Sequence, residues 1–250
     1  MILQKVAMIT GATRGIGLGI AKQMAQDGYA LAIMSRSNLE KVETNLQSIK
    51  RIGQPVLYFS GDLSNSEDRN IFCQRTLKEY GRIDFLINNA GIGSNLAFVS
   101  DYSEPEWDKI INTNLKSVFL CCKECVKNMI KNKSGHIINI ASILGKTGAP
   151  YFSIYSASKG GIIAFSKSLR EELKQFNIKV DIICPGSMNT PFIDAVKAKG
   201  KLKNILKPKR IDRSKMLDPK NVSDIILDIM VYPNKIFLDD IVIQSGDFKP

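Results

Sequence analysis

Tyr155 and Lys159 are side chains whose types and spacing could carry out acid–base chemistry. Residues four positions apart lie on one face of a helix, where an ammonium group favours the phenolate and lowers a tyrosine pKa from about 10 toward working pH. Ser142 ends a predicted strand 13 residues before Tyr155 and could hydrogen-bond a substrate carbonyl oxygen, polarising it toward hydride attack. A tyrosine and a lysine at this spacing also meet by chance, so neighbouring motifs decide their meaning. The three residues predict a site in which Tyr155 is a general acid.

A glycine-rich turn follows the first predicted strand, where residues 10–17 read T-G-A-T-R-G-I-G and open a helix that runs to about residue 28. Glycines here let the backbone approach a pyrophosphate at the positive end of the helix. Tight turns need glycine for backbone reasons too, but a strand before and a helix after favour phosphate binding. The turn predicts a dinucleotide site at Gly11, Gly15 and Gly17.

Ser35 and Arg36 end the second predicted strand, where a site for NAD(H) would have an acid to hold the ribose 2′-hydroxyl. A guanidinium at that place favours a 2′-phosphate, and Arg14 in the glycine turn could add a second cationic contact. Both arginines could instead be solvated surface residues, but the strand end is the selective position. The pair therefore predicts NADP(H) as the cofactor.

Short polar groups also end the third and fourth predicted strands, as G-D-L at 61–63 and N-N-A-G at 88–91. Such groups suit contact with a planar adenine and the backbone beside it. Asn89 could instead tie neighbouring strand ends together, or do both. These segments extend the predicted nucleotide site along the same edge of the sheet.

Short runs rich in isoleucine and valine alternate with longer amphipathic stretches along the whole chain. Strands of a parallel sheet are covered on both faces, so they read as continuous apolar runs. Helix start signals stand between the runs, namely Ser64 with Glu67, Ser103 with Glu106, Pro105, and Asp218 with Pro219. We therefore expect a single α/β domain over 1–250, a doubly wound parallel seven-stranded sheet of the Rossmann type. The predicted strands are 6–9, 30–34, 56–59, 85–87, 137–140, 180–183 and 236–243.

The composition excludes several kinds of site. The chain has 250 residues, of which 44% are hydrophobic and 24% charged, as in an ordinary globular protein that buries its own core. A single histidine, His136, argues against a Ser-His-Asp hydrolase, a Cys-His protease and a multi-histidine metal centre, and we predict no metal site. The N-terminus lacks a secretory signal and no run approaches the roughly 18 apolar residues of a membrane span, so we expect a cytoplasmic protein.

Cys121, Cys122 and Cys125 crowd into one predicted helix. The last two form a C-x-x-C, but a redox pair of that form opens a helix, and a zinc site needs a second pair. We interpret these thiols, together with Cys73 and Cys184, as small buried apolar side chains.

Positive charge is concentrated in residues 197–215, which hold nine lysines or arginines and one acid, or +8 of the formal net charge of +11. A nucleic-acid binder is an unfavoured reading, since this stretch has no aromatic residue and no nucleic-acid motif occurs. We expect the segment to belong to a mobile lid over about 188–216 that attracts an anionic substrate or an acidic carrier, although it could be only a solvated surface. A second basic patch near the site is expected from Lys127, Lys131, Lys133, Arg170 and Lys174.

These motifs together closely resemble the short-chain dehydrogenase/reductase family, over essentially the whole chain. The resemblance implies a catalytic tetrad of Asn114, Ser142, Tyr155 and Lys159, with Asn114 holding a water that links Lys159 to solvent. It also matches P-G-x-x-x-T at 185–190, where Thr190 would contact the nicotinamide carboxamide. With the motifs above, the expected cofactor contacts are Gly11, Thr13, Arg14, Gly15, Ile16, Gly17, Ser35, Arg36, Asp62, Leu63, Asn89, Ala90, Gly91, Tyr155, Lys159, Pro185, Gly186 and Thr190.

The pattern is most similar to the 3-oxoacyl-acyl-carrier-protein reductases, which implies an NADPH-dependent reductase with an acidic acyl carrier protein as a possible partner. The C-terminal segment 240–248 lacks a paired-glycine ending and is more similar to broad carbonyl, sugar or 3-hydroxy acid dehydrogenases of the same family. A non-catalytic NADP-binding protein is a further alternative, against which the complete tetrad stands. The family usually associates through the helices holding 114–130 and 155–175, so we expect a homodimer or homotetramer that binds neither nucleic acid nor membrane.

Overall fold

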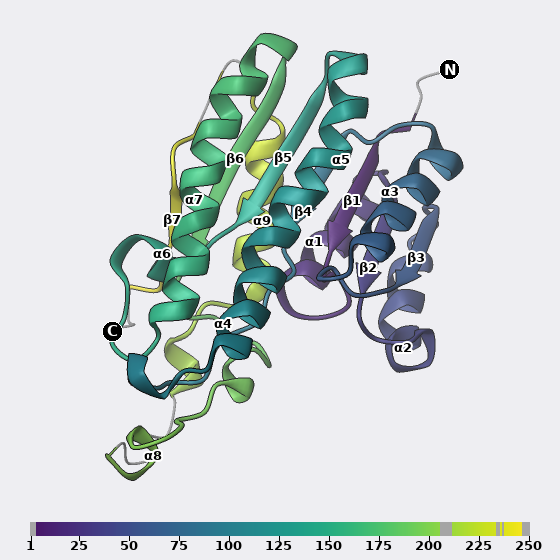
Figure 1. Ribbon diagram of the computed structural model, residues 1–250. Helices are drawn as coiled ribbons and strands as arrows, with labels where there is room; N and C mark the ends of the chain where they lie inside the picture. Colours follow the sequence, from purple (N-terminus) through teal and green to yellow (C-terminus); the bar gives the residue numbers. More distant parts are fainter. Residues whose placement is uncertain (1–3, 206–211, 234–235, 237, 247–250) are drawn as a thin grey trace.

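The computed structural model describes residues 4–205, 212–233, 236 and 238–246. In that part of the chain seven parallel strands form one sheet in the order β3-β2-β1-β4-β5-β6-β7 (Figure 1). The order reverses between β1 and β4, which is where doubly wound sheets bind their ligands. The strands are β1 (Val6–Thr10), β2 (Ala30–Ser35), β3 (Val56–Ser60), β4 (Phe85–Asn88), β5 (Gly135–Ile140), β6 (Ile178–Pro185) and β7 (Ile241–Ile243).

Helices cover both faces of the sheet because alternate strand residues point to opposite sides. Met8 of β1 belongs to the core under α3, α5 and α7, whereas Ala7 and Ile9 belong to the core under α1, α2 and α9. Figure 1 shows α5 and α7 in front of the sheet and α1 and α9 behind it. The helices are α1 (Gly15–Gln26), α2 (Leu39–Lys50), α3 (Ser66–Tyr80), α4 (Glu104–Ile111), α5 (Ser117–Asn132), α6 (Leu144–Thr147), α7 (Ser153–Leu173), α8 (Leu202–Ile205) and α9 (Pro219–Met230). The predicted doubly wound α/β sheet is confirmed.

The last strand is shorter than predicted, since β7 covers only Ile241–Ile243 of the expected 236–243. Asp240 has a φ of 39°, which is incompatible with an extended strand. Its carboxylate forms ion pairs with Lys146 and Lys167, and the neighbouring Asp239 forms an ion pair with Arg170. These charged contacts hold the chain in a bend where its apolar residues alone predicted a strand.

Two of the predicted helix starts are confirmed and one is wrong. Asp218 caps α9 by accepting a hydrogen bond from the Lys220 amide, with Pro219 as the first helical residue. The Glu106 carboxylate accepts the backbone N–H of Ser103 at the start of α4. At α3 the cap is Asn65, not the predicted Ser64, whose N–H and hydroxyl donate to Asp62 instead.

His136, the single histidine, lies in a buried polar cluster at the start of β5, away from the strand ends that carry the motifs. Its Nε2 lies 2.8 Å from Oδ2 of Asp181, which also pairs with Lys179 at 3.1 Å. Lys179 Nζ donates to the carbonyl of Ile229 in the last turn of α9, so the cation also satisfies a helix C-terminus. The cluster joins β5, β6 and α9 and has a structural role.

The five cysteines are free and buried, as predicted. Cys121, Cys122 and Cys125 lie on the inner face of α5, in the same core as Cys73 of α3. Burial raises the pKa of Cys122 to about 12, so this thiol is protonated and packs as a small apolar group. In the described parts of the chain, none of the helices is long and apolar enough to cross a membrane.

Candidate active site

A pocket of about 1370 Å³ runs along the carboxyl ends of the strands. It is lined by residues that end or follow all seven of them, from Gly11 after β1 to Gln244 after β7. Seventeen of the 18 residues predicted from the cofactor motifs contribute to its lining, and Gly17 does not. The pocket is larger than the roughly 300–1,000 Å³ of a site for a drug-sized ligand, so it has room for a dinucleotide together with a substrate.

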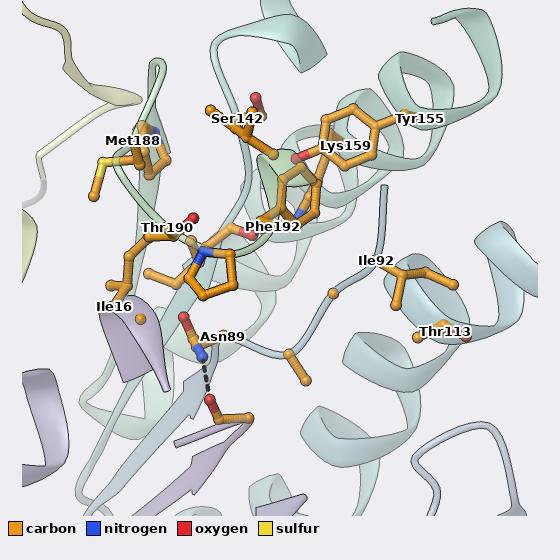
Figure 2. Close-up of a pocket in the computed structure, with 18 of the residues that line it drawn as sticks. Ile16, Asn89, Ile92, Thr113, Ser142, Tyr155, Lys159, Met188, Thr190 and Phe192 are labelled. Atoms are coloured by element: carbon orange, nitrogen blue, oxygen red, sulfur yellow. Dashed lines mark hydrogen bonds between the residues drawn. The ribbon is translucent and has the colours of Figure 1, made fainter. Parts of the chain in front are cut away.

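Gly17 and Asn114 do not line the pocket themselves but contact residues that do, namely Asn89 and Ile92. A Cβ on Gly17 would lie 2.4 Å from the side-chain nitrogen of Asn89, so only glycine lets α1 approach the loop after β4. Asn89 in turn donates to the carbonyls of Thr10 and Gly11, and the Thr10 hydroxyl accepts the amide of Asn89. Asn89 therefore does tie the ends of β1 and β4 together, and it lines the pocket as well (Figure 2).

The glycine turn has the geometry of an anion site. Gly11 and Gly15 have φ values of 68° and 55°, which residues other than glycine rarely adopt. The side chain of Arg14, the residue before α1, accepts no hydrogen bond from the first turn of the helix. The first backbone N–H groups of α1 can therefore donate to a ligand. The backbone here can cradle a pyrophosphate, as the sequence predicts.

Cations gather at the end of the pocket formed by β2 and the start of α2. Arg14 and Arg36 are exposed and line it, and Lys41 in the first turn of α2 lies there with them. Sequence reasoning missed Lys41, although its place five residues after Arg36, behind the Asn38 cap, could have indicated it. This end of the pocket can bind an anionic group.

Ser142, Tyr155 and Lys159 meet at the wall of the pocket formed by β5 and α7 (Figure 2). Lys159 Nζ lies 5.8 Å from the centre of the Tyr155 ring and donates to the carbonyl of Ile140 at 2.8 Å. The helical spacing thus places the pair as predicted, with Ser142 within hydrogen-bonding reach of the tyrosine.

The expected lowering of the tyrosine pKa by Lys159 is wrong for this structure. Burial raises the pKa of Tyr155 to about 12, and the hydrogen bond with Ser142 offsets only part of this effect. Burial likewise lowers the pKa of Lys159 to about 8, because the wall offers the ammonium little solvent. Tyr155 is therefore firmly protonated at neutral pH, which is the state that a proton donor needs.

Asn114 is placed by a short π-helical turn, Asn112–Lys116, between α4 and α5. Its Oδ1 accepts the amide of Ile92 at 2.8 Å, and its Nδ2 donates to the Ile92 carbonyl and to Ser158 of α7. A Cβ on Gly91 would lie 3.4 Å from both Asn114 Oδ1 and Lys159 Nζ, so the two polar groups flank this glycine. The side chain thereby fixes the loop after β4 against α7, beside Lys159.

The substrate half of the pocket, beyond Tyr155, is apolar. Phe152 stacks on the Tyr155 ring with the centroids 4.7 Å apart, and Phe192 lies 5.6 Å from the same ring. Sequence reasoning missed both phenylalanines. Phe152 directly precedes α7, three residues before Tyr155, whereas Phe192 comes beside Tyr155 only when the lid folds onto α7. The other apolar side chains that line this half include Ile92, Leu96, Ile143, Leu144 and Val196.

The lid packs against the loop that follows β4. Leu96 exchanges backbone hydrogen bonds with Lys197 and Lys199, and the Lys199 ammonium pairs with Glu106 of α4. Arg213 pairs with Asp194 within the lid. Several of the basic residues predicted to attract anions are thus already engaged, and residues 206–211 of the predicted lid lie outside the described residues.

The expected second basic patch near the site is wrong. Helices α5 and α7 run antiparallel to the strands, so their last turns lie at the amino ends of the strands, opposite the pocket. Lys133 caps the end of α5 two residues before β5 begins, and Lys127 pairs with Glu124. Arg170 is buried and donates to the Val180 carbonyl and to Asp239.

The chain matches a known family over most of its length. The profile described as short chain dehydrogenase matches residues 5–201. The chain is 40% identical over 191 residues to the 3-oxoacyl-[acyl-carrier-protein] reductase FabG of Chlamydia trachomatis serovar D, covering 76% of each chain. It is 35% identical over 196 residues to the protein of the same name from Staphylococcus aureus strain Mu50, covering 78% of this chain and 79% of the other.

Solved structures extend the similarity to nearly the whole chain. An alcohol dehydrogenase from the archaeon Thermococcus sibiricus, complexed with 5-hydroxy-NADP, is similar with a TM-score of 0.84 at 26% identity, covering 99% of both chains. A variant of actinorhodin polyketide ketoreductase with NADPH is similar with a TM-score of 0.86 at 26% identity, covering 97% of both chains. The structural likeness therefore extends beyond residue 201, where the match to the family profile ends.

Proposed function

Since the chain belongs to the short-chain dehydrogenase family of oxidoreductases, we propose that it is an NADPH-dependent reductase of a 3-oxoacyl thioester. The observation that carries this proposal is the meeting of Tyr155, Lys159 and Ser142 at one wall of a pocket that the glycine turn also lines. A proton donor and a dinucleotide cradle in one pocket are what carbonyl reduction requires.

The residues present fit a dinucleotide cofactor with a 2′-phosphate. Positive φ at Gly11 and Gly15 and the uncapped start of α1 suit the pyrophosphate, while Asp62 and Leu63 suit the adenine. Arg14 and Arg36 would pair with the 2′-phosphate, and no acid stands at the end of β2 to favour a free 2′-hydroxyl. The NADP-bound structural relatives support this choice.

The cofactor supplies hydride to the carbonyl carbon, and the chain supplies the proton and its positioning. Ser142 would hold the carbonyl oxygen while Tyr155, protonated because of its burial, donates the proton to it. Lys159 would stabilise the phenolate that remains and hold the cofactor's ribose. Thr190 would contact the carboxamide, and Asn114 would keep the path from Lys159 to solvent in place.

An uncharged thioester suits the pocket better than a free 3-hydroxy acid. Of the described charged residues that line it, Arg14, Arg36, Lys41 and Asp62 lie at the adenosine end. Lys159 is the remaining one, and it is held by the Ile140 carbonyl. The substrate half therefore offers a carboxylate no ion-pair partner among the described residues, and burying an unpaired charge there is costly. Relatives named 3-oxoacyl-[acyl-carrier-protein] reductase support the thioester.

Carrier binding, assembly and location are further parts of the proposal. Exposed lysines of the lid, among them Lys197, Lys201 and Lys203, would attract an acidic acyl carrier protein. Phe119 of α5 is 45% exposed and contacts Phe165 of α7, which supports a homodimer or homotetramer formed through these helices. The cytoplasmic location stays a prediction from the sequence.

A matched substrate panel tests the proposed function. We expect NADPH oxidation with acetoacetyl-N-acetylcysteamine, an uncharged thioester, at a kcat/KM at least about 100-fold above that for free acetoacetate. The same assay with NADH checks the cofactor. Comparable rates for the thioester and the free acid would contradict the thioester proposal, and activity on simple ketones alone would favour a broad carbonyl reductase.

A further inference from the structure

Phe192 is one of the lid residues that line the pocket. It follows Thr190 and Pro191 and precedes the short 3₁₀ turn Ile193–Ala195. Its ring lies 5.6 Å from the ring of Tyr155, at an interplanar angle of 54°. Figure 2 shows Phe192 beside Tyr155, on the side of the pocket where Thr190 also lies. A substrate carbonyl that meets the tyrosine hydroxyl must therefore share this space with the phenyl ring.

Gly93 in the loop after β4 is the surface on which the lid closes. A Cβ at this position would lie 2.9 Å from Val196 Cγ2 and 3.1 Å from Phe192 Cζ, closer than ordinary side chains approach. The lid side chains thus rest on the bare backbone of Gly93. Phe192 bridges the gap between this loop and Tyr155, and so closes one side of the substrate half.

Backbone contacts further along the lid hold this arrangement. The Leu96 amide donates to the Lys197 carbonyl and the Lys199 amide donates to Leu96, both at 2.9 Å. The Lys201 amide donates to the Asp101 carboxylate at 3.2 Å. These contacts hold the lid backbone after Phe192 against the loop that follows β4.

From this placement we propose that Phe192 is a specificity-determining residue. It limits the size of the ketone substituent that lies across the carbonyl from the thioester arm. The thioester arm is long and must extend toward solvent, so the short side of the ketone points to the end that Phe192 and Gly93 close. A methyl group fits there, whereas a phenyl group meets the Phe192 ring. The inference rests on the reductase function proposed above and names the class of ketone that the site accepts.

The test compares two thioesters that differ only in that group, acetoacetyl-N-acetylcysteamine and benzoylacetyl-N-acetylcysteamine. The quantity measured is the ratio of kcat/KM for the phenyl ketone to that for the methyl ketone, with NADPH. We expect Phe192→Ala to raise this ratio at least about 10-fold, since even one methylene in an apolar pocket changes discrimination by roughly 10–200-fold. Phe192→Leu, which keeps an apolar side chain against Gly93, should give an intermediate ratio.

Ile205→Ala is the matched control. This residue belongs to α8 in the same lid, is 61% exposed and does not line the pocket, so its removal should leave the ratio unchanged. If Phe192 only steadied the lid or Tyr155, its removal would lower kcat/KM for both thioesters by the same factor. An unchanged ratio in both Phe192 variants would overturn the inference while leaving the reductase function standing. Absence of methyl-ketone turnover in the unsubstituted enzyme would instead refute the function, and the specificity role with it.

Discussion

Raising the pH should slow carbonyl reduction through the loss of charge on Lys159. Burial lowers the pKa of this ammonium to about 8 and raises the pKa of Tyr155 to about 12. The charged fraction of Lys159 then falls from about nine-tenths at pH 7 to about one-tenth at pH 9, while Tyr155 keeps its proton throughout. If the charge stabilises the phenolate left by proton donation, kcat/KM should fall about 10-fold across this interval.

The assay is the initial rate of NADPH oxidation from pH 6 to pH 10, analysed as kcat/KM for NADPH because that parameter reports the groups of the free enzyme. Burial raises the pKa of the neighbouring Cys184 to about 11, so its thiol stays protonated over the interval. Cys184→Ser should therefore leave the midpoint near pH 8. A profile that stays flat to pH 10 would refute the reasoning, since it would mean that the ammonium is not desolvated or that its charge is not used.

Three further substitutions test the packing, the cofactor end and the lid. Lys179→Met should lower the free energy of unfolding by about 3–5 kcal/mol, measured by urea denaturation, because it removes the cation paired with the fully buried Asp181 carboxylate and leaves that carboxylate only His136 among the described residues. Adding Asp181→Leu should recover part of the loss, since the buried carboxylate is then gone but His136 loses its partner. Arg36→Glu should lower the preference for NADPH over NADH by roughly 10-fold or more in kcat/KM, and Lys50→Glu at the far end of α2 should not. Gly93→Ala should raise KM for the thioester, because its Cβ would push Phe192 and Val196 away, and an unchanged KM would contradict the close packing.

The sheet and the catalytic wall were predictable because local rules determine them. Buried parallel strands need continuous apolar runs, and the i, i+4 spacing of Tyr155 and Lys159 places both on one face of any helix that contains them. The glycine turn was predictable for the same reason, since its strand and helix are adjacent in the chain. These features need no knowledge of distant contacts.

The remaining features depend on contacts between distant segments. Asp239 and Asp240 bend the chain before β7 because of cations on α6 and α7, which the apolar pattern does not reveal. The pKa of Tyr155 follows from burial, which the spacing to Lys159 does not give. Phe192 reaches Tyr155 only because the lid folds onto Gly93. The misplaced basic patch was avoidable, since helices that follow parallel strands return to the amino ends of the sheet.

The most direct test of the account is the reductase activity of Tyr155→Phe beside that of the unsubstituted enzyme. NADPH oxidation is measured with acetoacetyl-N-acetylcysteamine, and NADPH binding is measured separately by the change in cofactor fluorescence. The account predicts that removal of the hydroxyl lowers kcat by about 10²–10⁴-fold, the usual contribution of a positioned general acid, while NADPH still binds. Activity within a few fold of the unsubstituted enzyme would contradict the central claim that Tyr155 donates the proton.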